Sequence, residues 1–193
     1  MRKFLGGVVT TLALGVCVGY AVLKLGLFPM GADNPPGALE RRVAHLATDA
    51  ALSKGAPKQD NPIPITVANL SEGARIYEQH CAVCHGGALH KVSPLQKQFS
   101  PPVPQMVNRK PHDPDNEFFW ITKHGYRMTG MPSWGKILTD DQIWTVVRFI
   151  LNYNKLPPEA EAAWQQAARQ YSGDSTMVPP AAKAPTVKSP VRR

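Results

Sequence analysis

The start of the chain is a long run of apolar positions. Residues 4–23 carry no charge, and the run continues to Phe28. About 20 apolar residues span a bilayer core as a helix, and basic residues before such a run favour keeping that end in the cytoplasm. The pattern predicts a transmembrane signal-anchor over residues 1–28. A cleavable signal peptide is the alternative, because Gly19 and Ala21 have the spacing of a cleavage site. Both predict export of the remaining chain across the inner membrane.

Residues 29–68 combine a linker with one amphipathic segment. Pro, Gly, Asp and Asn dominate positions 29–36, which is the composition of a linker. Apolar residues then recur at steps of three and four, so we expect a short helix over residues 38–52 with one apolar side. That side consists of Leu39, Val43, Leu46, Ala50 and Leu52. Pro62 and Pro64 predict an extended stretch that wraps the next domain or bridges it to the membrane.

The next region, residues 69–157, has helical periodicity in three places and no convincing alternation of a strand. Its first helix is predicted to follow an N-cap at Ser71 and to run to about Cys81. Its last helix begins at a capping box that opens with Thr139, and it ends before Pro157. We therefore predict an all-α domain.

The middle of this domain contains a long loop and a short helix. Residues 86–106 hold four prolines, and a loop of this length in a compact domain usually carries function. Asp113 and Pro114 predict a helix start, with Asp113 as the N-cap and Pro114 at the first helical position. Gly125 suits the end of that helix.

The last part of the chain, residues 158–193, is predicted to be an extra helix followed by a disordered tail. The helix is expected from Pro158 to Tyr171, with Trp164 as its one large apolar side chain. From Ser172 the chain is rich in Pro, Ala, Lys and Ser, and few large apolar residues remain to build a core.

Charge and cysteine content exclude several classes of protein. The chain has 22 Lys and Arg against 14 Asp and Glu, but no segment is strongly basic and basic residues do not alternate with aromatic ones. We therefore expect no nucleic-acid partner. Three cysteines cannot form a disulfide framework. Cys17 lies within the apolar run, where it is expected to act as a small hydrophobic residue.

The other two cysteines belong to the sequence C-x-x-C-H at residues 81–85, the attachment motif for c-type haem. Two thiols at this spacing, at the end of a helix, can each reach one vinyl group of the same porphyrin edge. We therefore expect one covalent haem c on Cys81 and Cys84, with His85 as the proximal iron ligand. A zinc site completed by nearby histidines and a thioredoxin-like redox pair are alternatives. The first lacks a second Cys pair, and the second lacks a βαβ pattern.

The distal iron ligand is predicted to be Met131. Gly130 and Pro132 on either side of it favour a non-helical loop that can lay the thioether across the haem face opposite His85. A thioether is a soft ligand, and His/Met ligation raises the reduction potential. Other methionines and histidines are rival ligands, namely Met106, Met128, His80, His90, His112 and His124.

These features resemble a class I cytochrome c domain over residues 69–155. The matching residues are Gly73, Tyr77, Cys81, Cys84, His85 and Gly86, then Gly125, Gly130, Met131 and Pro132, and then Val147, Phe149 and Ile150. The resemblance implies that the first and last helices cross, with Gly73 and Tyr77 against Trp144 or Phe149. It also implies that a proline carbonyl orients His85, and both Pro94 and Pro104 resemble that proline.

The expected function is electron transfer by a membrane-tethered, periplasm-facing cytochrome with redox proteins as partners. Such a carrier is not an enzyme and takes no small-molecule substrate. Cleavage of the first segment would instead leave it soluble in the periplasm. An alternative is a cytochrome subunit of a membrane-associated dehydrogenase or oxidase complex, which the flanking segments favour. A haem sensor or catalyst with an open sixth site is the third alternative, and it requires that Met131 not bind the iron.

Overall fold

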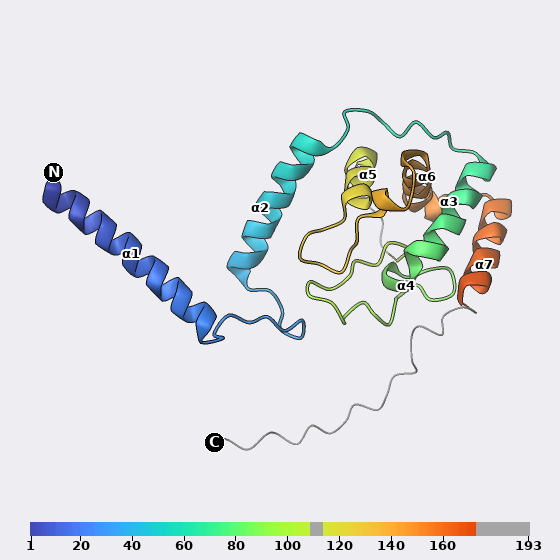
Figure 1. The fold of residues 1–193 in the computed structure, drawn as a ribbon. Helices are drawn as coiled ribbons and strands as arrows, with labels where there is room; N and C mark the ends of the chain where they lie inside the picture. The colour runs from blue at the N-terminus through green and yellow to red at the C-terminus, as the bar shows by residue number, and fades with distance from the viewer. Residues whose placement is uncertain (109–113, 173–193) are drawn as a thin grey trace, which may run out of the picture.

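The computed structural model describes residues 1–108 and 114–172, in which helices are the only regular elements (Figure 1). This confirms the all-α prediction. The α-helices are α1 (Arg2–Lys24), α2 (Ala38–Gly55), α3 (Val67–His80), α4 (Ala82–His85), α5 (Asp115–His124), α6 (Asp140–Asn152) and α7 (Pro158–Ser172). Two 3₁₀ turns flank α6, with η1 (Trp134–Lys136) before it and η2 (Tyr153–Lys155) after it.

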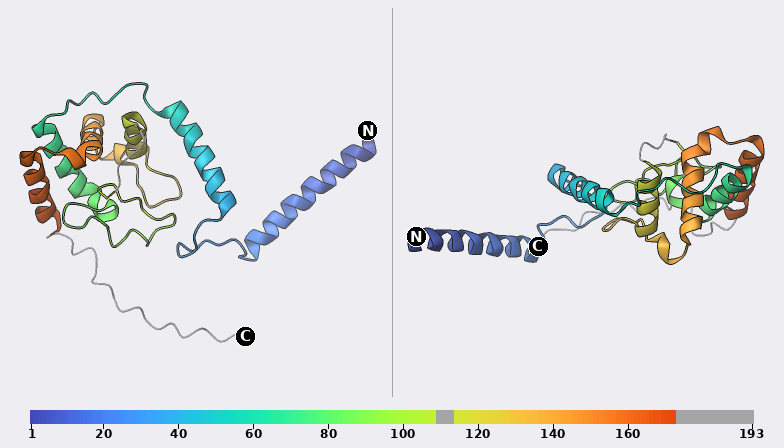
Figure 2. Two further views of the ribbon diagram at one scale, coloured as in Figure 1. Left: turned by 180° about the vertical axis from the view of Figure 1, so that it is seen from behind. Right: turned by 90° about the horizontal axis from the view of Figure 1, so that it is seen from above.

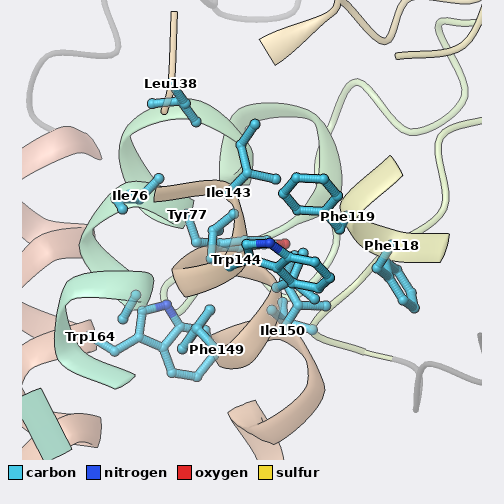
Figure 3. Packing of buried hydrophobic residues seen from close by; sticks show 14 residues of the cluster. Ile76, Tyr77, Phe118, Phe119, Leu138, Ile143, Trp144, Phe149, Ile150 and Trp164 are labelled. Carbon is cyan, nitrogen blue, oxygen red and sulfur yellow. The ribbon is translucent and has the colours of Figure 1, made fainter. Parts of the chain in front are cut away.

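The centre of the fold is the close crossing of α3 and α6. A Cβ atom on Gly73 would lie 2.5 Å from the Thr145 carbonyl oxygen and 2.7 Å from Phe149 Cβ, so only glycine fits at this point. One turn later, the ring of Tyr77 packs on Phe149 with 5.4 Å between centroids. The expected contact of a small residue with an aromatic one is therefore made with Phe149. Trp144 instead stacks on Phe119 at 4.1 Å (Figure 3).

The ends of these helices agree with the sequence in two cases and differ in two. Gln142 and Thr139 form the expected capping box before α6, and Gly125 ends α5 with a φ of 67°. The prediction of Ser71 as the N-cap of α3 is wrong, because Thr66 takes that role and accepts a hydrogen bond from the Asn69 amide.

The start of α5 differs by one residue. Pro114 occupies the N-cap instead of the first helical position, because its backbone is extended rather than helical. Asp113, the predicted N-cap, lies outside the described residues.

Helix α7 packs against α3, and its anchor Trp164 is fully buried beside Phe149 (Figure 3). The Trp164 indole N–H donates to Glu78 Oε1 at 2.5 Å, and the Ala88 amide donates to the same oxygen at 2.8 Å. Burial raises the pKa of Glu78, against the opposing effect of these two hydrogen bonds. One carboxylate thus joins α3, α7 and the loop after α4. The tail predicted to be disordered lies outside the described residues from residue 173 on.

The extended stretch before α3 lies across α6, which is one of the two arrangements that the sequence left open. Asn61 donates from its side-chain amide to the Trp144 carbonyl at 2.9 Å. Arg148 donates in return to the carbonyls of Ile63 and Asn61, at 2.8 and 2.9 Å. This stretch therefore wraps the helical core.

Of the five residues predicted to form the apolar side of α2, only Leu52 is buried. Leu52 is buried, and Gly55 lies so close to the Trp120 indole of α5 that a Cβ would come within 2.5 Å of the ring nitrogen. Leu52 follows Val43 by nine residues, about half a turn out of phase in an α-helix, so the two cannot share a side. The other predicted members are exposed, namely Leu39, Val43, Leu46 and Ala50.

Helix α1 stands apart from the other helices (Figures 1 and 2). Within residues 1–108 and 114–172, it alone has the length and apolar composition needed to cross a membrane, and its best window has a mean hydropathy of 1.9. A signal sequence near the N-terminus meets the same criterion.

Substitution of Gly73 tests the α3–α6 crossing. The change Gly73→Ala is expected to lower the free energy of unfolding by about 1–3 kcal/mol, because the helices must separate to admit the methyl group. Ser71→Ala, on the same helix but away from the crossing, should change it by less than about 0.5 kcal/mol. Thermal and denaturant unfolding of both variants measures the difference, and equal stabilities would contradict the close approach.

Candidate functional site

The two cysteines and the histidine of the motif lie where α3 ends and the short helix α4 begins, with Cys84 and His85 inside α4. Cys81 ends α3 and begins α4, and its carbonyl accepts hydrogen bonds from the amides of Cys84 and His85 at 3.1 and 2.9 Å. Both thiols are free and partly buried. Burial raises the pKa of Cys81 to about 12 and raises that of Cys84. Both side chains are therefore protonated thiols at neutral pH.

The imidazole of His85 is oriented by the long loop. Its Nδ1 lies 2.7 Å from the carbonyl oxygen of Pro104, so Pro104, and not Pro94, makes the contact that the resemblance implied. A carbonyl only accepts, so Nδ1 carries the hydrogen and Nε2 is left with its lone pair. Burial lowers the pKa of His85, whereas the Pro104 bond acts in the opposite direction. A neutral imidazole with its second nitrogen fixed in this way is the usual form of a metal-binding histidine.

The backbone after His85 is held from two further directions. The buried hydroxyl of Tyr77 donates to the Gly86 carbonyl at 2.7 Å, and the Met106 amide donates to the His85 carbonyl at 3.0 Å. Gly86 has a φ of 79°, and a Cβ there would lie 2.5 Å from the Lys91 carbonyl oxygen. The chain therefore turns sharply away from the histidine in a conformation that favours glycine.

The loop that carries Met131 is fixed by its glycines. At Gly125, a Cβ would come within 2.6 Å of the Met131 carbonyl oxygen, which also accepts a hydrogen bond from the Tyr126 amide. At Gly130, a Cβ would lie 2.5 Å from Phe99 Cδ1. The methionine loop thus closes on the same long loop that supplies Pro104. Met131 itself is partly buried.

Rival ligands have other surroundings. Met128 has a φ of 60° and is 93% exposed, and Met106 packs against the hydrophobic core. His80 lies against the Trp134 ring at 5.2 Å, and burial followed by the charge of Arg75 lowers its pKa. His90 and His124 are exposed, and His112 lies outside the described residues.

The set of donors fits a c-type haem better than a zinc ion. Within residues 1–108 and 114–172, no group of three or more His, Cys, Asp and Glu side chains is placed to hold a metal ion. Two thiols one helical turn apart, next to an imidazole with a fixed tautomer, are instead the groups that thioether attachment and axial ligation require.

Sequence reasoning missed the polar side chains that support this site. Ser93 and Gln105 are buried in the long loop and donate to carbonyl groups of α4, and the Tyr77 hydroxyl donates from α3 to the carbonyl of Gly86, the residue after α4. The aromatic position of Tyr77 was visible from the resemblance, but its hydrogen bond was not. Nothing in the spacing of Ser93 and Gln105 distinguishes them from other polar loop residues.

Comparisons with known proteins agree with this geometry. The family model described as "Cytochrome C oxidase, cbb3-type, subunit III" matches residues 68–150, the range from α3 through most of α6. The quinohemoprotein alcohol dehydrogenase ADH-IIG of Pseudomonas putida is 26% identical over 135 residues, which are 66% of this chain and 17% of that protein. No significant match was found among solved structures. Residues 68–150 of this chain form a c-type cytochrome domain.

Proposed function

We propose that this protein is a membrane-tethered carrier with one covalent haem, ligated by His85 and Met131. A c-type cytochrome domain implies haem-based electron transfer. The observation that carries the finer assignment is the 2.7 Å contact between His85 Nδ1 and the Pro104 carbonyl, beside the two free thiols of the motif. This contact supports His85 as the proximal ligand, because it leaves Nε2 for the iron.

The roles of the protein groups follow from their chemistry. Cys81 and Cys84 would hold the haem through thioether bonds to its two vinyl groups, and addition of each S–H across a C=C bond would need no oxidant or reductant. His85 would bind the iron through Nε2 and Met131 through its thioether sulfur. Pro104 of the long loop orients His85, and the loop after α5 carries Met131. Bound haem supplies the Fe(III)/Fe(II) couple, and fixed ligands keep the site nearly unchanged between the two states.

The tether is assigned to α1. Its length and composition suit a membrane span, and its basic start followed by an apolar run favours a periplasmic location for the cytochrome domain. Removal of α1 as a signal peptide would instead leave a soluble periplasmic carrier. In both cases the cytochrome domain docks with donor and acceptor proteins through a small, transient interface.

A second candidate is a cytochrome subunit of an oxidoreductase complex. The matching family model is described by an oxidase subunit, and the related protein is a quinohemoprotein alcohol dehydrogenase. Helices α2 and α7 lie outside the residues matched to the family model and provide surface beyond that segment. A carrier that acts alone does not need this surface.

The Met131→Ala variant tests the distal ligand. We expect haem to stay attached, the reduced protein to bind carbon monoxide, and the reduction potential to fall on the order of a tenth of a volt or more, because a soft ligand is lost. Met128→Ala is the matched control, since that side chain is exposed in the same loop, and it should behave as the parent protein. Carbon monoxide binding to the Met128 variant alone would move the ligand to Met128.

Replacing both Cys81 and Cys84 by alanine tests covalent attachment. In the parent protein, haem should remain with the polypeptide on a denaturing gel and stain there. The double variant should give no stained band, because neither thioether can form. Cys17→Ala should keep the stain, since that residue lies in α1. Staining of the double variant at the parental level would reject attachment at α4.

Purification of the full chain from detergent-solubilised membranes separates the two candidate functions. A free carrier should elute without a stoichiometric partner, at a size set by its 21.1 kDa mass and the detergent. A dehydrogenase or oxidase subunit that stays bound in constant ratio would favour the complex instead.

A further inference from the structure

The side-chain amide of Gln105 lies at the centre of the contacts between α4 and the long loop. It is 8% exposed and makes three hydrogen bonds. Its Oε1 accepts from the Ser93 amide at 2.6 Å, and its Nε2 donates to the carbonyls of Cys84 and Val103 at 3.1 and 3.0 Å. Both amide hydrogens and the oxygen are thus engaged, so the orientation of this side chain is fixed.

The contacts of Gln105 continue into those of its two neighbours. Pro104 accepts from the ring of His85, and the Met106 amide donates to the His85 carbonyl. Three consecutive residues of the loop therefore bond to Cys84 and His85 at the end of α4. The last carbonyls of a helix have no partner within it, which makes the end of α4 a natural anchor for such a segment.

We infer that Gln105 is a positioning residue of the haem site, which holds the Pro104 carbonyl against His85 and thereby lowers the reduction potential. The inference rests on the proposed role of His85 as the proximal ligand. The amide ties Val103, on one side of Pro104, to Cys84, on one side of His85. The distance between acceptor and imidazole is therefore set by a bridge between their immediate neighbours.

The direction of the effect follows from the basicity of the imidazole. A carbonyl that accepts from the ring N–H makes the ligand more electron-donating, which favours Fe(III). Without the bridge, the Pro104 carbonyl is free to move away from the ring and the bond weakens. The oxidised state then loses part of its stabilisation, so the reduction potential rises.

The test uses the full chain with haem attached and the change Gln105→Met, which keeps the length of the side chain but removes all three hydrogen bonds. At the midpoint potential of the parent protein, the ratio of reduced to oxidised haem should rise about fivefold, the equivalent of one ordinary hydrogen bond. In the reduced protein, the ring N–H of His85 should exchange faster with solvent. Gln105→Asn keeps the amide but is too short for all three partners, so it should shift both measurements in the same direction by less.

Two controls separate positioning from general stability. Gln98→Met makes the same change at an exposed position of the same loop and should alter nothing. Asn61→Ala removes another buried side-chain amide, which donates to the Trp144 carbonyl of α6, so it should lower the melting temperature yet leave the redox ratio within about twofold.

The outcomes are distinct from those that test the function. The inference would be overturned if both Gln105 variants fold and show the redox ratio and the His85 N–H exchange rate of the parent protein. Haem ligation by His85 would still stand in that case. Failure of both variants to acquire haem, with Asn61→Ala maturing normally, would also overturn it, because Gln105 would then be required for folding. A parent protein that carries no haem on His85 would reject the proposed function itself.

Discussion

The close approach of α3 and α6 at Gly73 is the constraint on which the rest of the structure depends. It places Tyr77 one turn later against Phe149, with its hydroxyl aimed at the Gly86 carbonyl. It also fixes the direction of α3 and therefore the position of Cys81, which caps the end of α3 and the start of α4. A contact between two backbones therefore sets the position of a helix of four residues that is too short to be stable alone.

The long loop completes the site that the crossing begins. A stretch of this length without regular structure needs partners for its polar groups, and many of them are supplied by α4. Ser93, Gln105 and Met106 bond to the carbonyls at the end of that helix, while the Pro104 carbonyl accepts from His85. The loop and the short helix thus supply hydrogen-bond partners for each other, and neither is fixed without the other. Proline and glycine disfavour regular structure, so the polar groups of the loop stay available for hydrogen bonds with α4.

Patterns local in the chain predicted local features well. The capping box before α6, the end of α5 at Gly125 and the motif on α4 all depend on neighbouring residues, and the structure has them where the sequence placed them. The prediction of Ser71 as the N-cap of α3 failed because Thr66, which is equally able to cap a helix, lies about one and a half turns earlier. Pro104 could not be separated from Pro94, and the role of Gln105 could not be seen, because both depend on how the long loop folds back. The side of α2 that is buried likewise depends on Trp120, a residue far along the chain.

The packing of α7 shows that the domain does not end where its family resemblance ends. Trp164 lies beyond the matched residues, yet its ring is buried against Phe149 and its indole N–H bonds to Glu78. Glu78 in turn accepts from the Ala88 amide, three residues after His85. Burial disfavours the charged form of this carboxylate and raises its pKa, so stability falls as pH rises from the unfolded pKa through the higher folded one. A carboxylate kept at such a cost is best explained by the two donors that it holds together, which join α7 to the segment that leaves the histidine.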